Sequence, residues 1–422
     1  MKIGMLTQWY DPETGPAALP AVYAREFIKN GHEVKVLTGF PNYPEGKLYP
    51  GYSLRPRMTQ SELPLQVTRV ALYPNHNSSA VGRVANYASF ALSASILGQK
   101  ALSGVDAIWV YNSPVTVAAP LMFHSKFGKT PIFLHVQDLW PDSLMESGMV
   151  PDGFVGKQAE RAIAALVRLM ETRSAVVGVI SEGVKDLLLE RNPSLDPNKI
   201  VYVPNPTNEQ LFVNSGIDKK YPIISSNQQP VEIMYAGAIG EVQGLDTVLE
   251  AAAILRDREN IKFTFVGDGI SRVKLEEKSK ELNLSNVNFV GRVSQSSIPT
   301  LIARADIQLV SLSSNPFLAH TTPSKIPSLL SSGVPIIAQI EGDGARLLEK
   351  SKAAVVVKPG DSQQMAFSIL KLVEQGPARW IQMGKDGRNF YQENFSAAAA
   401  SEKIVDALKN VLENSRHSRE SR

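Results

Sequence analysis

Short apolar segments rich in β-branched residues recur along the whole chain, and segments with helical spacing separate them. Strands that are apolar throughout and alternate with helices are typical of parallel sheets covered by helices. The series is interrupted once, by a polar stretch with several prolines from Asn205 to Pro230, and then starts again. We therefore expect two doubly wound, Rossmann-like α/β domains. The expected strands include 34–38, 107–111, 131–136, 175–180 and 200–203 before the interruption, and 231–235, 262–266, 287–290, 307–310, 335–338 and 354–357 after it.

The interruption also sets the expected domain boundaries. A chain of 422 residues exceeds what one hydrophobic core usually organises. We expect an N-terminal domain at 1–205, a linker at 206–227, a second domain at 228–395, and a C-terminal helix and tail at 396–422. Ligands of open parallel sheets bind outside the carboxyl ends of the strands, so two facing domains would form a central cleft.

Composition excludes several classes of protein. The chain has no cysteine, which rules out disulfides, thiolate metal sites and a cysteine nucleophile, and fits a reducing compartment. The strand-like start at Lys2 to Leu6 does not resemble a signal peptide, and no apolar segment approaches the roughly 20 residues that span a bilayer. We expect a cytoplasmic protein. A net charge of +3 is too small to indicate nucleic-acid binding.

The positive charge is unevenly distributed, however. Between Lys47 and Lys100 the only acidic residue is Glu62. The basic residues of this segment are Lys47, Arg55, Arg57, Arg69, Arg83 and Lys100. The apolar stretch Tyr87 to Leu97 lies in the same segment. The basic residues and the apolar stretch together have two interpretations. They predict either weak, reversible contact with the inner face of the plasma membrane, or an ordinary core helix beneath a solvated basic face.

Three loops that follow predicted strands contain glycines. Gly15 ends a turn-rich loop before a helix, where it indicates either close approach to a ligand or a plain turn. In the second half, Gly237, Gly240 and Gly244 lie within eight residues at a strand-to-helix turn. Such spacing leaves room for a phosphate to contact main-chain N–H groups. Gly267 ends the next strand in a similar turn.

The sequence Thr322-Pro323 predicts a helix start, with threonine as the N-cap and proline at the first helical position. Lys325 would then lie in the first turn, where its charge opposes the helix dipole by roughly 0.3 to 1 kcal/mol. A bound anion would remove this conflict. The alternative is a surface lysine whose charge is solvated.

Two polar residues lie at or near the end of a buried-type strand of the first half. Asp138 comes just past the end of the strand that contains His135, where a carboxylate can face a cleft. Both residues also have a purely structural interpretation, Asp138 in a turn before Trp140-Pro141 and His135 in the core.

Taken together, these positions resemble glycosyltransferase family 4, whose members are retaining nucleotide-sugar transferases with the GT-B fold. The similarity is greatest to the branch that builds bacterial O-antigen, capsule and colanic-acid-like polysaccharides, including L-fucosamine (FucNAc) transferases. The matching stretches are GFPNYPEG (39–46), HVQDLWPDS (135–143), VISEGVKDLL (179–188), VPNPTNEQLF (203–212), YAGAIGEVQGLD (235–246), VGDG (266–269), FVGRVS (289–294) and TPSKIPSLLSSGVPIIA (322–338).

The resemblance implies a donor site in the second domain and an acceptor site in the first. The implied donor-binding residues are Gly15, Gly237, Gly240, Gln243, Gly244, Gly267, Gly291, Arg292, Val293, His320, Thr321, Thr322, Pro323, Ser324, Lys325 and Ser328. We expect Asp138, Gln137 and Lys325 to act in catalysis. The expected acceptor or membrane contacts are Trp9, Tyr10, Asn42, Tyr43, Arg55, Arg57, Arg83 and Tyr87.

The chain departs from the family pattern at several functional positions. The usual basic pair of the glycine-rich loop falls on Ala238 and Gln243, and the usual two glutamates fall on His320 and Ser328. Gln137 stands where a histidine often precedes the first-domain aspartate. Lys325 and Arg292 could supply the missing positive charge.

We therefore expect a retaining glycosyltransferase that moves a sugar from a nucleotide sugar to a lipid-linked acceptor. UDP and an N-acetylated deoxyhexose are the expected donor parts, with the nucleotide sugar as a substrate. No cluster of acidic residues with metal-binding spacing stands out, so we expect no cofactor and no divalent metal. Two alternatives remain: a non-catalytic nucleotide-sugar-binding partner of another transferase, and a nucleotide-sugar 2-epimerase, which needs paired carboxylates and histidines.

Overall fold

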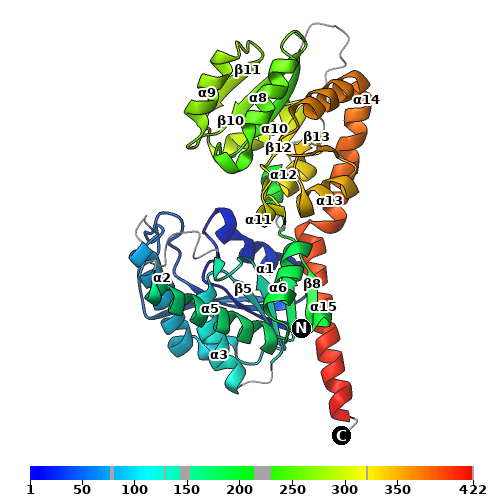
Figure 1. The fold of residues 1–422 in the computed structure, drawn as a ribbon. Coiled ribbons are helices and arrows are strands. Elements are labelled where there is room, and N and C mark those ends of the chain that lie inside the picture. Colours follow the sequence, from blue (N-terminus) through cyan, green and yellow to red (C-terminus); the bar gives the residue numbers. More distant parts are fainter. Residues whose placement is uncertain (77–79, 128–129, 143–152, 213–229, 320–321, 421–422) are drawn as a thin grey trace. The chain divides into compact units, whose positions relative to one another are not determined.

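The computed structural model describes residues 1–76, 80–127, 130–142, 153–212, 230–319 and 322–420. These residues form two compact units, one made of Met1–Asn205 with Ala397–Arg422 and the other of Pro206–Ser396. In each unit helices flank a mainly parallel sheet (Figure 1). The predicted two-domain α/β fold with parallel sheets is confirmed.

The sheet of the first unit has the strand order β3-β4-β2-β1-β5-β6-β7-β8. All neighbouring strands are parallel except β3 and β4, which form an antiparallel hairpin at one edge. The chain reverses its direction of winding between β1 and β5, which are neighbours in the sheet. The strands are β1 (Lys2–Leu6), β2 (Glu33–Gly39), β3 (Arg57–Glu62), β4 (Leu65–Val70), β5 (Ala107–Asn112), β6 (Ile132–Val136), β7 (Val176–Val179) and β8 (Ile200–Tyr202).

Helices cover this sheet, and the last helix of the chain is one of them. Ile404 and Leu408 of that helix, α15, are fully buried in a core shared with α1. The helices are α1 (Leu19–Lys29), α2 (Ala80–Leu97), α3 (Ala118–Phe127), α5 (Phe154–Arg173), α6 (Glu182–Arg191) and α15 (Ala397–Glu420), with short 3-10 turns η1 (Gly15–Ala18), η2 (Gln99–Leu102), η3 (Val115–Val117) and η4 (Pro197–Lys199).

The sheet of the second unit has the order β11-β10-β9-β12-β13-β14, and all its strand pairs are parallel. Counted within the unit this is 3-2-1-4-5-6, the order of the doubly wound dinucleotide-binding fold. Its switch point lies between β9 and β12. The strands are β9 (Val231–Ala236), β10 (Ile261–Val266), β11 (Val287–Gly291), β12 (Ile307–Ser311), β13 (Ile336–Gln339) and β14 (Ala354–Val357).

The helices of the second unit include a long one, α14, whose backbone is interrupted at Gly376 before Pro377. They are α7 (Glu209–Phe212), α8 (Leu245–Ile254), α9 (Arg272–Glu281), α10 (Ile298–Arg304), α11 (Pro316–Ala319), α12 (Lys325–Ser332), α13 (Gly342–Ser351) and α14 (Ser362–Asn394), with 3-10 turns η5 (Glu241–Gln243) and η6 (Gln295–Ser297).

Burial explains why the central strands could be found from sequence. Every residue of β5, β6 and β12 is buried, so these strands lie between helices and consist mostly of apolar residues. The edge strand β3 is almost wholly exposed and polar, and an apolar pattern could not reveal it. No helix in the described part of the chain combines the length and apolar character needed to cross a membrane.

Candidate functional site

The glycine-rich loop of the second unit follows β9, at the switch point of the sheet. Gly237 directly follows the strand, and Gly244, in the left-handed region, precedes α8. The N–H groups of Gly237, Gly240 and Gly244 donate to Val266 O, Gln243 Oε1 and Glu241 O, respectively. These three N–H groups are therefore already used inside the protein. The loop glycines leave room for a ligand but do not offer it these N–H groups as donors.

The backbones of two loops touch at Gly267, which follows β10. A Cβ atom on Gly267 would lie 1.8 Å from the carbonyl oxygen of Gly237. Gly267 also has φ of 145°, which side chains disfavour. The close approach of the two loops therefore requires glycine at this position.

Gly267→Ala should displace the glycine-rich loop, because the new methyl group cannot coexist with the Gly237 carbonyl. We expect a lower melting temperature and at least tenfold weaker binding of UDP, measured by thermal unfolding and calorimetric titration. Gly360→Ala is the matched control, since Gly360 has φ of 85° but open space around it. If both variants bind UDP like the wild type, close packing of the two loops is not needed for nucleotide binding.

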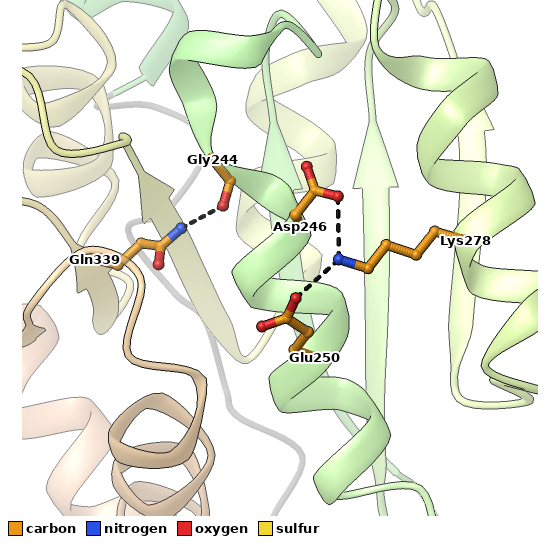
Figure 2. Close-up of polar contacts among 5 residues, drawn as sticks. All are labelled: Gly244, Asp246, Glu250, Lys278 and Gln339. Carbon is orange, nitrogen blue, oxygen red and sulfur yellow. Dashed lines mark hydrogen bonds and ion pairs between the residues drawn. The ribbon is translucent and has the colours of Figure 1, made fainter.

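Side chains from neighbouring strands hold the end of the loop. Gln339 of β13 donates to the carbonyl oxygen of Gly244 at 2.7 Å, and Ser311 of β12 donates to that of Gln243 (Figure 2 shows the Gln339 contact). The start of α8 is tied to α9, because Lys278 pairs with Asp246 at 3.1 Å and with Glu250 at 2.9 Å (Figure 2). The start of α8 is thus fixed from two sides.

A pocket of about 440 Å³ opens beside the glycine-rich loop. This volume lies in the range of small-molecule sites. Backbone-rich loops after three adjacent strands form it, with Arg292 and Val293 following β11. Its lining is Gly237, Ala238, Val266, Gly267, Asp268, Gly269, Arg292, Val293 and Ile298. Gly291, the last residue of β11, accepts a hydrogen bond from Gly267 and supports this edge of the pocket.

The ammonium group of Lys325 reaches the glycine-rich loop from the start of α12. Its Nζ is buried and has no hydrogen-bond partner in the described part of the chain. The Nζ lies 3.9 Å from the centre of the Tyr235 ring and would be 2.9 Å from a Cβ on Gly237. Burial lowers the pKa of Lys325 from 10.5 to about 7. A solvated surface lysine, the alternative from sequence, is therefore wrong.

The helix that carries Lys325 begins later than Thr322-Pro323 predicted. Its first residue is Lys325, and Ser324 is the N-cap, without a side-chain cap hydrogen bond. The reason is Pro327, which has no N–H. Only the first four residues of a helix lack an intrahelical acceptor for their N–H, so proline is tolerated only there. In a helix that begins at Lys325, Pro327 is the third residue and fits. In a helix that began at Pro323, Pro327 would be the fifth residue and would leave a hydrogen bond unmade.

The other donor-binding residues predicted between His320 and Ser328 differ in what the structure shows of them. Thr322 and Pro323 are half-buried and Ser324 is exposed, whereas His320 and Thr321 lie outside the described residues. The Ser328 hydroxyl on α12 hydrogen-bonds to the Thr207 hydroxyl at 2.6 Å. Ser328 is thus already engaged within this unit.

In the first unit, Asp138 follows β6 and is held by the end of β5. Ser113 donates from its hydroxyl to Asp138 Oδ2 at 2.6 Å. Burial raises the pKa of Asp138, and this hydrogen bond partly opposes the increase. The carboxylate is therefore positioned and basic enough to accept a proton or a hydroxyl hydrogen bond.

Several polar atoms beyond the same strand ends are buried without partners among the described residues. Gln137 accepts a hydrogen bond from Asn205 Nδ2 at 2.6 Å, but Gln137 Nε2 and Asn205 Oδ1 are unsatisfied. Trp140 Nε1 and Asn112 Oδ1 are also unsatisfied. Buried polar groups are usually paired, so an edge with both free donors and free acceptors is suited to a neutral, hydroxyl-rich ligand.

His135 is a core residue. It is fully buried among aromatic rings, and its Nε2 lies 3.0 Å from the carbonyl oxygen of Val203. Burial lowers the pKa of His135 to about 4, so the ring is neutral near pH 7. It is not available as a surface acid or base.

The predicted acceptor residues fall into two groups. Trp9, Tyr43 and Tyr87 form a ring cluster, with centroid distances of 5.5 Å and 6.4 Å from Trp9 to the two tyrosines. Asn42 joins the same region through a hydrogen bond from Asn86, and Tyr10 is buried nearby. Gly15, which was predicted as a donor contact, begins η1 of the same unit with φ of 66° and open space around it.

The basic residues behave differently from the aromatic ones. Arg55 and Arg57 are exposed, whereas Arg83 is half-buried on α2. Arg83 lies close to His76, whose pKa burial lowers and the arginine charge lowers further. Only Arg55 and Arg57 of the three therefore present their charge fully to solvent.

Two residues near these sites were not predicted from sequence. Glu13 is buried and accepts hydrogen bonds from the backbone N–H groups of Tyr10, Asn42 and Tyr43, which ties two loops together. Burial raises its pKa to about 7 despite these bonds. Tyr235 was missed because an aromatic residue at the end of a strand usually indicates only core packing.

Two family models match the chain, one in each unit. The model described as "Glycosyl transferase 4-like domain" matches residues 14–206, and the model described as "Glycosyl transferases group 1" matches residues 230–375. A relative named as a colanic acid biosynthesis glycosyl transferase, WcaI of Escherichia coli strain K12, is 29% identical over 379 residues, which cover 87% of this chain and 91% of WcaI. The chain is a glycosyltransferase with the GT-B fold.

Two further proteins show how widely this glycosyltransferase is related. A UDP-N-acetylglucosamine--N-acetylmuramyl-(pentapeptide) pyrophosphoryl-undecaprenol N-acetylglucosamine transferase of Listeria monocytogenes is 25% identical over 293 residues, covering 66% of this chain and 76% of the relative. The crystal structure of HepE from Anabaena with UDP and glucose has a TM-score of 0.60 at 14% identity, covering 97% of this chain and 99% of HepE. The latter similarity concerns the fold alone.

Proposed function

We propose that this glycosyltransferase transfers a sugar from a UDP-linked donor to a lipid-linked acceptor in bacterial surface polysaccharide synthesis. The observation that carries the proposal is the buried Nζ of Lys325 beside Gly237, which has no hydrogen-bond partner among the described residues. A buried amine without a partner is costly, and an anion at the glycine-rich loop would stabilise it. The diphosphate of a nucleotide sugar supplies that anion, and the neighbouring 440 Å³ pocket would hold its base beside Arg292 and Val293.

The proposed chemistry requires a cation where the leaving group gains charge. As the bond between the sugar C1 and the diphosphate oxygen breaks, negative charge grows on the diphosphate, and protonated Lys325 stabilises it. The acceptor hydroxyl forms the new bond to C1 on the same face, with retention, and passes its proton to the departing diphosphate. Because Lys325 supplies the positive charge, we propose that the reaction needs no divalent metal.

The acceptor side of the proposal rests on the first unit. Asp138 and the unsatisfied polar atoms around it suit a hydroxyl-rich ligand, and we propose that Asp138 orients the reacting hydroxyl. An N-acetylated deoxyhexose such as FucNAc is the proposed sugar. The name of the relative from Listeria gives UDP-N-acetylglucosamine and an undecaprenol-linked acceptor, which supports a UDP-linked N-acetyl sugar and a lipid-linked acceptor. We further propose that the protein is cytoplasmic and contacts the membrane weakly to reach such an acceptor.

Calorimetric titration with UDP tests the donor half of this proposal and should reveal proton uptake. In the free protein the pKa of Lys325 is about 7, and a bound diphosphate raises it. Above pH 7 the amine is mostly neutral, so binding takes up a proton. Affinity should therefore fall as pH rises from 7 to 9, by up to about tenfold per unit. Titrations in two buffers of different ionisation enthalpy would count the protons, with close to one taken up at pH 8.5, where the terminal phosphate of free UDP is already ionised.

Titrations with GDP and with uridine separate the contributions of the base and of the phosphates to the affinity. Turnover is measured separately, as the release of UDP from a panel of UDP-N-acetylhexosamines. UDP binding without proton uptake at pH 8.5 would exclude Lys325 as the phosphate ligand. UDP binding without turnover of any donor, with every acceptor tried, would instead support a non-catalytic nucleotide-sugar-binding protein.

A further inference from the structure

Helix α2 exposes an apolar face. Val81, Val84, Leu92 and Ile96 have exposed fractions of 79%, 48%, 63% and 66%, and the exposed Ala88 lies between them. Their spacing of three, four, four and four residues places them on one side of the helix. This side forms a continuous apolar stripe, which we call the α2 stripe.

The inner side of α2 is apolar as well. Phe90 and Ala94 are fully buried in the core of the first unit. The one charged residue in the sequence of the helix is Arg83, which is half-buried and outside the stripe. A helix packed on a core usually presents charged residues to water on its other side. The α2 stripe is therefore not a typical solvent-facing surface.

The size of the stripe indicates what could cover it. Ile96 follows Val81 by fifteen residues, so the stripe is about 22 Å long, and with a width of about 10 Å it covers only about 220 Å². Stable interfaces between proteins bury about 800 Å² on each partner. Their energetic centres are enriched in Trp, Tyr and Arg, and the stripe contains none of these. A second copy of the chain is thus a poor match, whereas a single apolar helix face is enough to rest in a lipid interface.

The charge around the stripe complements an anionic bilayer. Residues 63–105 include no Asp or Glu, and the exposed Lys100 follows Ile96 by four residues. The exposed Arg57 pairs in the sheet with Val70, and the chain then leads to Tyr73, whose N–H donates to Ser89 of α2 at 2.8 Å. Exposed basic residues thus lie just after α2 and on the hairpin joined to its flank, and the nearest acid of that hairpin, Glu62, lies at its opposite end, paired with Leu65.

We propose that the α2 stripe is a docking surface for an anionic lipid bilayer. Its aliphatic side chains enter the boundary between headgroups and acyl chains, while Lys100, Arg55 and Arg57 contact anionic headgroups. Docking through this surface requires neither nucleotide nor sugar transfer. This inference rests on the weak membrane contact in the proposed function and assigns that contact to a defined surface. Its test does not depend on the donor site.

Vesicle cosedimentation of the full chain would test the proposal. We expect binding to vesicles of phosphatidylcholine with phosphatidylglycerol at low salt, and little binding to phosphatidylcholine alone or at high salt. Leu92→Gln/Ile96→Gln should weaken binding at least tenfold, and Arg55→Gln/Arg57→Gln at least threefold with a reduced salt dependence. The matched control is Ile270→Gln/Val273→Gln on the second unit, where both residues are also exposed, and it should bind normally.

A second measurement covers variants that fold poorly. Since the chain has no cysteine, Leu92→Cys can be labelled at one site with an environment-sensitive fluorophore. Its emission should shift to the blue on adding anionic vesicles, and that of labelled Ile270→Cys should not. The proposal is overturned if wild type ignores anionic vesicles at low salt, if the Leu92/Ile96 variant binds them equally, or if label at Leu92 shows no shift. A dimer in sedimentation velocity that this variant dissociates would assign the stripe to a second copy instead.

Discussion

Lys325→Met should weaken UDP binding at least tenfold and at the same time raise the melting temperature. The substitution removes the cation that faces the glycine-rich loop, and with it the charge that we propose stabilises the leaving diphosphate. In the unliganded protein, however, the same Nζ is buried without a hydrogen-bond partner in the described part of the chain, and burial lowers its pKa to about 7. An unbranched apolar side chain of similar length avoids that cost. Turnover should fall by about 10² to 10³ if the cation acts on the leaving group.

The opposite directions of the two effects distinguish a ligand-binding lysine from a structural one. Calorimetric titration gives the affinity for UDP, and thermal unfolding without ligand gives the melting temperature. Lys274→Met, at an exposed position of α9, is the matched control and should change neither. A lower melting temperature for Lys325→Met with unchanged UDP affinity would show that Lys325 supports the fold and does not bind the donor.

The position of Lys325 near a helix start could be predicted from sequence, but its burial and its lowered pKa could not. The motif around Pro323 places a lysine near a helix start, which is a local property. Burial lowers its pKa, and the Tyr235 ring and the Gly237 backbone that lie beside its Nζ come from the end of β9 and the loop after it, almost ninety residues earlier. Burial of this kind is decided by tertiary packing, so a local pattern left a solvated lysine as a possibility.

The departures from the family pattern are also clearer in the structure. Gln243 stands in place of a basic residue, and its Oε1 accepts from Gly240 N–H at 2.9 Å. The side chain therefore closes the loop on itself. A sequence pattern can show that a charge is missing there, but only the structure shows that the glutamine has a structural contact of its own.

The limits of prediction were similar in the first unit. Buried strands such as β6 were predictable because both faces need apolar residues, and Asp138 could be placed at a strand end for the same reason. The contact from Ser113 could not be foreseen, because it depends on β5 and β6 being neighbours in the sheet. Glu13 was missed because nothing in a turn-rich loop indicates that a carboxylate will bind three backbone amides from separate segments.

Asp138→Asn should lower turnover by at least 10² while leaving UDP affinity near that of the wild type. Asparagine keeps the shape of the side chain and can still accept the hydrogen bond from Ser113, so the fold should be preserved. It lacks the negative charge that we propose holds and orients the acceptor hydroxyl, and a misplaced reacting group costs about 10² in rate. Asp138 belongs to the first unit, whereas the proposed nucleotide contacts belong to the second. An interaction made mainly in the transition state lowers kcat without weakening ground-state nucleotide binding.

Ser113→Ala keeps the carboxylate of Asp138 but changes its pKa. The Ser113 hydroxyl stabilises the ionised carboxylate, and its loss should raise the pKa of Asp138 further above the usual value. In the proposed mechanism the ionised form is the active one, so the acid limb of the pH–rate profile should move to higher pH, while the rate at high pH falls only modestly. Steady-state release of UDP from the donor between pH 5 and 9 would record both changes. Equal turnover of Asp138→Asn and wild type, or an acid limb that does not move in Ser113→Ala, would remove Asp138 from the transfer step.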